Sequence, residues 1–315
     1  MLTGTQAIPT FSRIRLLGYV SLCLIWGSTW LAIRVVVRDV PPLQAAAVRF
    51  LAAAALLLIV VLLQKRSWPK DKSEWHAIFV LSITVMAVPY GLLFWAEQYV
   101  TSSMTAIFYS AMPMVVSLIT LLLTQSKVPR NAVYAMLVAF GALLYLIYDG
   151  LSTKGRGMLG GAAVLFSMML SAWSVVYAKK RLRDVDSVVA TGLQLLCGSV
   201  VLFWGMWAME SHRHAVWTKA ALLAMLFLTL FGSAAAFVIY YWLLKTLHPY
   251  QLSTISLLTP VIAVMEGALF WGERVSLMML LAVAVVLGSI GVVLRAEKNA
   301  TPQADDILML RGNTE

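Results

Sequence analysis

The sequence predicts an all-α integral membrane protein with ten transmembrane helices, arranged as two inverted repeats of five helices each. Three observations support this fold class: the composition, the spacing of the apolar runs and an internal repeat. Of the 315 residues, 61% are hydrophobic and only 12% are charged, and the mean hydropathy is +0.85. Since a soluble domain usually carries roughly 25% charged residues, this composition argues against a soluble fold.

The predicted helices are apolar runs bounded by charged residues, Pro or Gly, and each is close to the length of about 20 residues that crosses a hydrocarbon core. The first five runs cover residues 16–37, 43–63, 76–97, 102–124 and 130–148. The second five cover residues 157–178, 187–208, 219–244, 250–271 and 276–294. Cys23 and Cys197 both fall inside such runs, so we interpret them as buried small hydrophobes and expect no disulfide.

The distribution of positive charge predicts the orientation. With a cytoplasmic N-terminus, sixteen of the 24 Lys and Arg residues lie in cytoplasmic segments and six on the other side, while Arg34 and Arg49 lie within apolar runs. Cytoplasmic segments of membrane proteins carry an excess of Lys and Arg. We therefore expect both termini to be cytoplasmic and the protein to reside in a bacterial inner membrane. No A-x-A-like cleavage site follows the first apolar run, so this run is expected to be retained as a helix.

The second half of the chain repeats the first at a shift of 147 residues. The pairs aligned without a gap are Trp95 with Trp242, Pro113 with Pro260, Lys127 with Arg274, Val128 with Val275, and Gly141 with Gly288. Near the start of each half the best shift is 145, which places Arg34 on Lys179. Because five is an odd number, the second repeat enters the membrane from the opposite side. Inverted repeats are typical of alternating-access transporters with a substrate site near the midplane.

The repeat also sets the domain organisation. We expect a cytoplasmic N-terminus at 1–15, a first repeat at 16–148 and a linker at 149–156. A second repeat follows at 157–295, and residues 296–315 are polar enough to form a disordered cytoplasmic tail.

No pattern of residues indicates an enzyme. The four His residues lie at helix ends or in loops, and the sequence has no HExxH motif. His212 and His214 share a short loop that could bind a metal weakly, although a solvated loop explains them better. We therefore expect no catalytic residue, metal site or cofactor. The alternative is a duplicated membrane scaffold that serves as an enzyme or a sensor.

Several short motifs resemble those of a known family. They are Ile25-Trp26-Gly27-Ser28-Thr29-Trp30 in the first run, Arg49-Phe50-Leu51-Ala52 in the second, and Ala96-Glu97-Gln98, Met112-Pro113, Thr259-Pro260-Val261 and Gly272-Glu273 further on. With ten helices in two inverted halves, the chain resembles the EamA-type exporters of the drug/metabolite transporter superfamily over nearly all of residues 16–295. This resemblance implies a central cavity lined by both halves and export of amino acids or related metabolites.

Two prolines are the best sequence indication of the midplane site. Pro113 and Pro260 fall about halfway along their runs and carry no N–H, so the carbonyls of Tyr109 and Ser256, four residues earlier, lose their usual partner. Free carbonyls are tolerated inside a membrane where they face a cavity or a neighbour. We expect the two prolines to act as hinges and Tyr109 and Ser256 to line the site. The alternative is that the prolines only bend their helices.

Aromatic residues gather in the runs that would surround a cavity. They are Trp26, Trp30, Tyr90, Trp95, Trp173, Tyr177, Tyr240, Tyr241 and Trp242. An aromatic wall suits apolar side chains, or an ammonium group through cation–π attraction. It therefore fits an amino-acid exporter and an importer of a small cationic amine equally well, and some of these rings must face lipid.

Two charged residues fall well inside apolar runs and are candidates for the site because charges in a bilayer are costly. Arg49 and Glu266 both lie in the outer halves of their helices. Arg49 is expected to bind an anionic group or to contribute an outer gate, and Glu266 to pair with it or to titrate during transport. Alternatively, both side chains extend separately to the outer headgroups.

The expected partners follow from these assignments. They are a small-molecule substrate, the lipid bilayer and, as an open question, a coupling ion. The net charge of +10 is explained by orientation, so no nucleic-acid partner is expected. Gly157 and Gly161 form a GxxxG motif that would allow a homodimer, but a single such motif is weak support. A membrane receptor or channel is the alternative from another class of protein.

Overall fold

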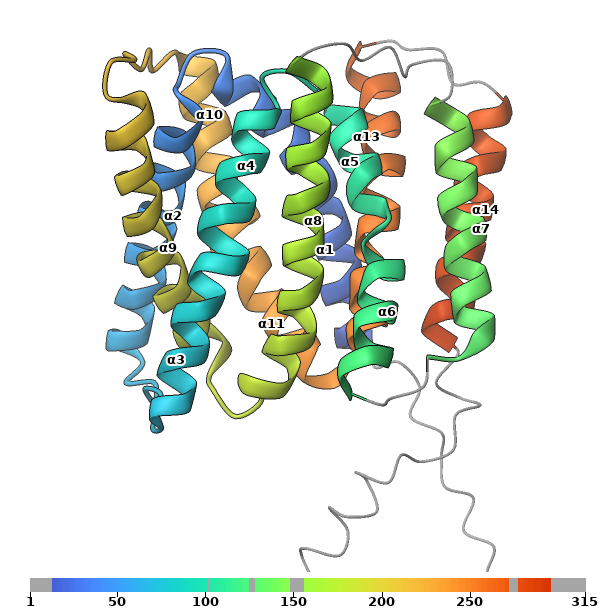
Figure 1. Cartoon of the computed structure of the whole chain (residues 1–315), viewed down its shortest axis with the longest axis horizontal. Coiled ribbons are helices and arrows are strands. Elements are labelled where there is room, and N and C mark those ends of the chain that lie inside the picture. The colour runs from blue at the N-terminus through green and yellow to red at the C-terminus, as the bar shows by residue number, and fades with distance from the viewer. Residues whose placement is uncertain (1–12, 101, 125–127, 148–155, 272–276, 296–315) are drawn as a thin grey trace, which may run out of the picture.

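The chain forms a bundle of helices that run side by side, with no strand among the residues that the structure describes (Figure 1). The computed structural model describes residues 13–100, 102–124, 128–147, 156–271 and 277–295. The expected linker, apart from Arg156, and the expected tail at 296–315 lie outside these residues. The all-helical class predicted from composition and hydropathy is confirmed.

The first half contains seven α-helical elements and one π-helical element within the described residues. They are α1 (Arg13–Val37), α2 (Pro42–Leu63), α3 (Lys72–Leu81), η1 (Ser82–Ala87), α4 (Val88–Ala96), α5 (Ser102–Ser110), α6 (Met112–Thr124) and α7 (Arg130–Ile147). The elements α3, η1 and α4 follow one another without a break, whereas α5 and α6 are separated at Ala111.

The second half has the same order of elements. They are α8 (Arg156–Arg181), α9 (Ser187–Glu210), α10 (Lys219–Phe227), η3 (Leu228–Ala235), α11 (Ala236–Thr246), α12 (Pro249–Ser253), α13 (Ile255–Trp271) and α14 (Leu277–Arg295). Here α10, η3 and α11 are continuous, and the interruption falls at Thr254, between α12 and α13.

Six helices in the described part are long and apolar enough to cross a membrane. They are Arg13–Val37, Pro42–Leu63, Lys72–Ala96, Arg156–Arg181, Ser187–Glu210 and Lys219–Thr246. The expected total of ten spans stays a prediction, because the remaining apolar helices are shorter in the described residues.

The two halves interlock with approximate symmetry. Helices α1 and α8, which open the two halves, begin at opposite ends of the bundle (Figure 1). Corresponding helices pack against each other, α2 against α9 and α7 against α14. In the same way α1 contacts α10 and α13, while α8 contacts α4 and α6. The centre of the bundle is therefore bounded by both halves.

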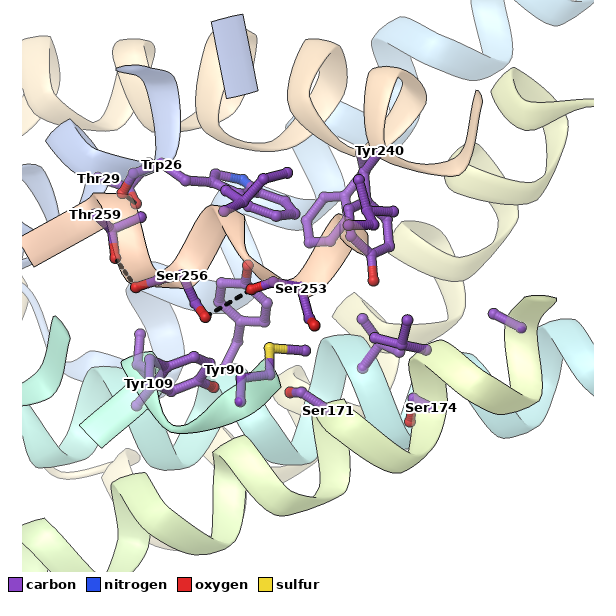
Figure 2. A pocket seen from close by; sticks show the side chains of 18 of the residues that line it. Trp26, Thr29, Tyr90, Tyr109, Ser171, Ser174, Tyr240, Ser253, Ser256 and Thr259 are labelled. Atoms are coloured by element: carbon purple, nitrogen blue, oxygen red, sulfur yellow. Dashed lines mark hydrogen bonds between the residues drawn. The ribbon is translucent and has the colours of Figure 1, made fainter. Parts of the chain in front are cut away.

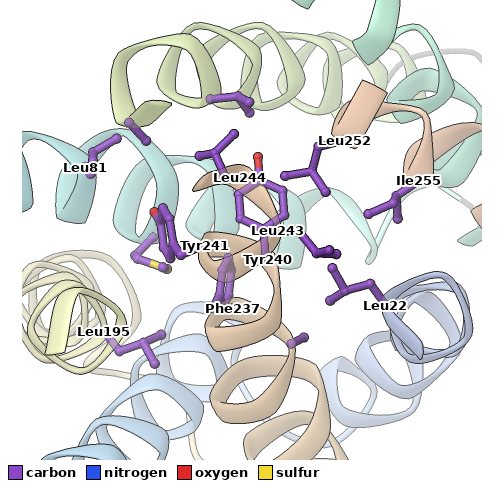
Figure 3. Close-up of a cluster of buried hydrophobic side chains, with 14 of the residues drawn as sticks. Leu22, Leu81, Leu195, Phe237, Tyr240, Tyr241, Leu243, Leu244, Leu252 and Ile255 are labelled. Carbon is purple, nitrogen blue, oxygen red and sulfur yellow. The ribbon is translucent and has the colours of Figure 1, made fainter. Parts of the chain in front are cut away.

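The core includes α11, whose aromatic residues are surrounded by aliphatic side chains from several helices. Figure 3 shows Phe237, Tyr240 and Tyr241 among leucines of α1, α3, α9 and α12. All three rings are buried. This packing brings α11, which is remote in sequence, against the first half.

The π-helical elements occupy equivalent positions in the two halves. The shift of 147 residues places η1 on residues 229–234, inside η3. In the first half Pro89 follows η1 and has no N–H to donate to the preceding turn. Such wide turns are rare in proteins overall, and where they do occur they are often found at functional sites.

Carboxylates at both ends join α2 to α9. Glu210, at the end of α9, accepts hydrogen bonds from the backbone N–H groups of Leu43 (3.0 Å) and Gln44 (3.1 Å) at the start of α2. Asp186, at the start of α9, forms an ion pair of 2.8 Å with Arg66, beyond the end of α2. A carboxylate at a helix N-terminus satisfies orphan donors and complements the helix dipole. The α2–α9 pair is thus fixed at both ends.

We expect replacement of Glu210 by Ala to destabilise the bundle by about 1–2 kcal/mol, because two N–H groups at the start of α2 lose their acceptor. The melting temperature of the purified protein in detergent measures this loss. Asp184→Ala removes an exposed carboxylate near the other end of α9 and is the matched control. Equal melting temperatures for the two variants would contradict the capping role of Glu210.

Candidate functional site

A cavity of about 100 Å³ lies between the two halves (Figure 2). Its walls come from α1, η1, α4, α5 and α6 of the first half and from α8, α11, α12 and α13 of the second. Seven of the lining residues are aromatic: Trp26, Trp30, Tyr90, Tyr109, Phe237, Tyr240 and Tyr241. Six carry hydroxyl groups on short side chains: Thr29, Ser171, Ser174, Ser253, Ser256 and Thr259. No charged side chain is among the described residues that line it.

The aromatic residues that line the cavity contact one another in two groups. The ring of Trp26 lies 5.6 Å from that of Phe237 and 5.3 Å from that of Tyr240, measured between centroids. Trp30 and Tyr109 form a separate pair whose ring centroids lie 5.3 Å apart. Tyr90 and Phe237, which the shift of 147 residues aligns, meet at 5.9 Å. The two repeats therefore contribute equivalent positions to one cavity.

A stripe of hydroxyl groups follows α12 and α13 along another wall. Ser253, Ser256 and Thr259 are spaced by three residues, and each donates to the carbonyl three residues before it, at 2.9, 2.8 and 3.1 Å (Figure 2). Since each hydroxyl hydrogen is used within the helix, the oxygen lone pairs are left to accept hydrogen bonds. This wall is therefore an acceptor surface for a ligand that donates N–H or O–H groups.

The sequence suggested that the carbonyl of Ser256 is free, but in the structure it has a donor. Pro260 removes its backbone donor, but the hydroxyl of Thr259 takes that place at 3.1 Å. Pro260 lies inside α13, whereas Pro113 follows the interruption at Ala111. Neither proline lines the cavity.

Five of the residues proposed from the sequence line the cavity. They are Trp26, Trp30, Tyr90, Tyr109 and Ser256. Tyr240 and Tyr241, from the same aromatic group, line it as well.

Other proposed aromatics lie away from the cavity. Trp173 stacks on Tyr177 at 4.9 Å along α8, and the cavity face of α8 is formed by Ser171, Ser174, Val175 and Ala178 instead. Trp95 packs on Tyr99 at 5.1 Å, and Trp242 packs beside Gly18 of α1. These residues lie on other faces of their helices. Grouping aromatic residues by type does not show which helix face each one occupies.

Sequence reasoning missed Phe237 and the hydroxyl stripe. Phe237 could have been found as the repeat equivalent of Tyr90. The stripe could have been found from the spacing of three residues between Ser253, Ser256 and Thr259, which keeps them on one helical face.

Arg49 does not line the cavity but lies behind its wall. It is fully buried, its Nη2 donates to the carbonyl of Gly232 at 2.9 Å, and its Nε donates to Oγ of Ser233 at 2.6 Å. Its guanidinium carbon lies 5.2 Å from the centroid of the Tyr90 ring. The side chain of Glu266 lies outside the described residues, so the proposed pairing of Arg49 with Glu266 stays a prediction.

An all-helical membrane bundle with two interlocked halves around a central cavity defines the class of multi-pass membrane transporters. A profile of the EamA-like transporter family matches residues 14–148 and again residues 158–295. The chain belongs to this family, and the resemblance inferred from its motifs is confirmed.

Curated relatives and a solved structure agree with this assignment. Protein PagO of Salmonella typhimurium is 28% identical over 273 residues, which cover 86% of this chain and 90% of PagO. The uncharacterized inner membrane transporter YedA of Escherichia coli is 28% identical over 285 residues, which cover 90% of this chain and 89% of YedA. A solved crystal structure of a protein is similar with a TM-score of 0.74 at 17% identity, covering 91% of this chain and 99% of that one. At this identity the structural likeness shows the fold alone.

We expect Gly27→Ala to reduce transport strongly, because Gly27 lets α1 approach α13 next to the cavity. A Cβ at this position would lie 2.6 Å from Cγ2 of Ile262, so α13 would have to move. Uptake or efflux at matched membrane levels measures the effect. Gly288→Ala is the control, because a Cβ there meets nothing within 4 Å among the described residues. Wild-type transport by the Gly27 variant would show that this contact does not shape the cavity.

Proposed function

We propose that this transporter exports small metabolites, amino acids or related compounds, by alternating access. The observation that carries the proposal is the cavity, because it is lined by both halves and its side chains are largely buried. Relative motion of two interlocked halves around such a cavity would expose it to one side of the membrane and then to the other.

The proposal includes a topology of ten spans. Besides the six membrane-capable helices, α5 with α6, α7, α12 with α13, and α14 would each cross the membrane once. The first repeat would cover residues 16–148 and the second 157–295, with 149–156 as the linker. Both termini would then be cytoplasmic, in agreement with the excess of Lys and Arg in cytoplasmic segments.

The chemistry of the cavity favours a substrate without net positive charge. The hydroxyl stripe offers acceptors to an ammonium or other donor group, and the hydroxyls of Tyr90 and Tyr240 point into the cavity (Figure 2). No carboxylate is among the described lining residues, and the guanidinium of Arg49 lies directly behind Tyr90. A zwitterion or a neutral metabolite therefore suits the cavity better than the cationic amine of the importer alternative.

The end of the bundle at which α8 terminates is held closed by lysine side chains. Nζ of Lys179 donates to the carbonyls of Leu244, Lys245 and Leu247, at 2.6, 3.1 and 3.0 Å. Nζ of Lys245 in turn donates to the carbonyl of Val185. These bonds join α8 to the end of α11, below the cavity, and would close it toward the cytoplasm.

The repeat equivalent of Lys179 makes no such contacts. Arg34 corresponds to Lys179, and the carbonyls of Glu97, Gln98 and Val100 correspond to those that Lys179 binds. Within the described residues, Arg34 forms no hydrogen bond or ion pair. In an alternating cycle, Arg34 would bind these carbonyls when the outer end closes, and Lys179 would release its own.

We expect Lys179→Gln to open the cytoplasmic end. Val175→Cys, in a chain whose Cys23 and Cys197 are replaced by Ala, places a thiol in the cavity wall one turn away. Its rate of reaction with N-ethylmaleimide should rise about tenfold when Lys179 is replaced, since three hydrogen bonds of a charged donor are lost. Lys180→Gln, at the exposed neighbouring position, is the control and should leave the rate unchanged. Equal rates in both variants would exclude the closing role of Lys179.

The proposed function is tested by mass spectrometry of the medium. Cells that express the intact chain are compared with cells that express Trp26→Ala, which removes the central ring of the aromatic wall, at matched membrane levels. Trp204→Ala, at a position that is 65% exposed on the outer surface of α9, is the control. We expect particular amino acids or related metabolites to be enriched only with the intact chain and the Trp204 variant. Intracellular accumulation of a supplied amine would favour the importer, and steady single-channel current would favour a channel.

A further inference from the structure

Arg49 carries a full positive charge in the interior of a membrane bundle, and the transport site does not use it directly. Burying such a charge in a bilayer is costly, and charges found there are usually functional. Arg49 is 0% exposed, and its Nη1 has no hydrogen-bond partner among the described residues. The other two nitrogens are bound to η3, the π-helical element of the second half.

The carbonyl of Gly232 connects Arg49 to the cavity wall. This oxygen accepts from Nη2 of Arg49 at 2.9 Å and also from Nε1 of Trp26 at 3.4 Å. A carbonyl oxygen has two lone pairs and serves both donors. Trp26 is therefore fixed from behind by the same backbone atom that binds the guanidinium.

The guanidinium also orients a second wall residue. Its carbon lies 5.2 Å from the ring centroid of Tyr90, 5.4 Å from that of Phe50 and 5.8 Å from that of Phe94. Phe50 packs on Tyr90 edge to face at 5.0 Å. Cation–π contacts in a desolvated site hold these rings in place.

The approach of η3 to this cluster requires glycine. A Cβ at Gly232 would lie 2.9 Å from Cγ2 of Thr29 and 3.1 Å from Nη2 of Arg49. Any side chain at this position would push η3 away from α1 and α2, and the bonds of Arg49 and Trp26 to the carbonyl would lengthen together.

The second half has a neutral version of the same arrangement. The shift of 145 residues places Arg49 on Gln194, which is also fully buried. Oε1 of Gln194 accepts from the hydroxyl of Tyr241 at 2.6 Å, and Tyr241 lines the cavity. Each half therefore backs an aromatic wall residue with a polar side chain of its second helix, but only the first half uses a charge for it.

From these contacts we propose that Arg49 is a positioning residue. It sets the orientation of Trp26 through the carbonyl of Gly232 and that of Tyr90 by the direct contact of its guanidinium with the ring. The effect of this role on transport rests on the proposed function, whereas its effect on Trp26 does not. The role differs from a gate or a direct substrate contact, because Arg49 acts through η3 and the aromatic rings.

The first test follows Trp26 itself. The full chain is labelled with 5-fluorotryptophan, placed in lipid nanodiscs and examined by fluorine NMR, with the Trp26 resonance assigned by Trp26→Phe. We expect Arg49→Gln, which introduces the residue of the second repeat, and Gly232→Ala each to shift this resonance. Arg181→Gln, at an exposed position, and Gly141→Ala, where a Cβ meets nothing within 4 Å of the described residues, should leave it in place.

An unshifted Trp26 resonance in folded Arg49→Gln protein would overturn the proposal. Should this variant fail to fold, Gly232→Ala decides in the same way, because it retains the charge of Arg49 but displaces the carbonyl that joins Arg49 to Trp26. The melting temperature identifies which of these cases applies.

The second test uses transport in proteoliposomes with the substrate identified from the medium. We expect Arg49→Gln to raise KM about tenfold, the loss typical of a hydrogen bond to a charged group, and to change the maximal rate less. In a Trp26→Phe background the same substitution should have a smaller effect, since one of the two residues that Arg49 positions is absent. Additive effects would overturn the positioning role. If no substrate is found, the proposed function fails while the NMR result still decides the role of Arg49.

Discussion

Every polar group that this chain places inside the membrane has to find its partner within the chain, because the hydrocarbon core offers none. The structure meets this constraint by contacts between helices, both across the two halves and within one half. Glu210 of α9 caps the start of α2, and Lys179 of α8 binds three carbonyls at the end of α11. These contacts satisfy helix ends and determine how the helices pack around the cavity. The same bonds that complete the fold therefore also determine how the helices around the cavity are held together.

The repeat gives a scaffold of approximate symmetry, and some equivalent positions in its two halves carry different residues. Tyr90 and Phe237 are equivalent and meet at the cavity, yet Arg49 is equivalent to Gln194 and Lys179 to Arg34. Lys179 binds three carbonyls at its end of the bundle, whereas Arg34 forms no such bonds within the described residues, so the two ends of the bundle are not equivalent in this conformation. Arg49 places a positive charge behind Tyr90, whereas its equivalent Gln194 places a neutral side chain behind Tyr241.

Much of the fold could be predicted from the sequence because apolar runs must match the bilayer. The run predicted at 43–63 is α2, Pro42–Leu63, and the run predicted at 187–208 is contained in α9. The π-helical elements and the interruptions at Ala111 and Thr254 were not predicted, since they depend on packing between halves rather than on local composition. Of the site, Trp26 and Tyr90 could be identified by residue type. The face of α8 that lines the cavity could not be identified in this way, because residue type favours Trp173, whereas Ser171 and Ser174 form the wall.

The positions of the helix interruptions bear on how the cavity opens. Prolines suggested hinges at Pro113 and Pro260, but the backbone leaves the α-helix at Ala111 and Thr254. Both interruptions are adjacent to lining residues, Met112 in one case and Ser253 in the other. Irregular backbone at membrane depth is tolerated only where it borders a cavity or is buried in protein, so these sites mark the functional centre more directly than the prolines do. Bending at Thr254 would move Ser256 and Thr259 of α13 relative to Ser253 of α12, and the acceptor surface of the cavity would change with it.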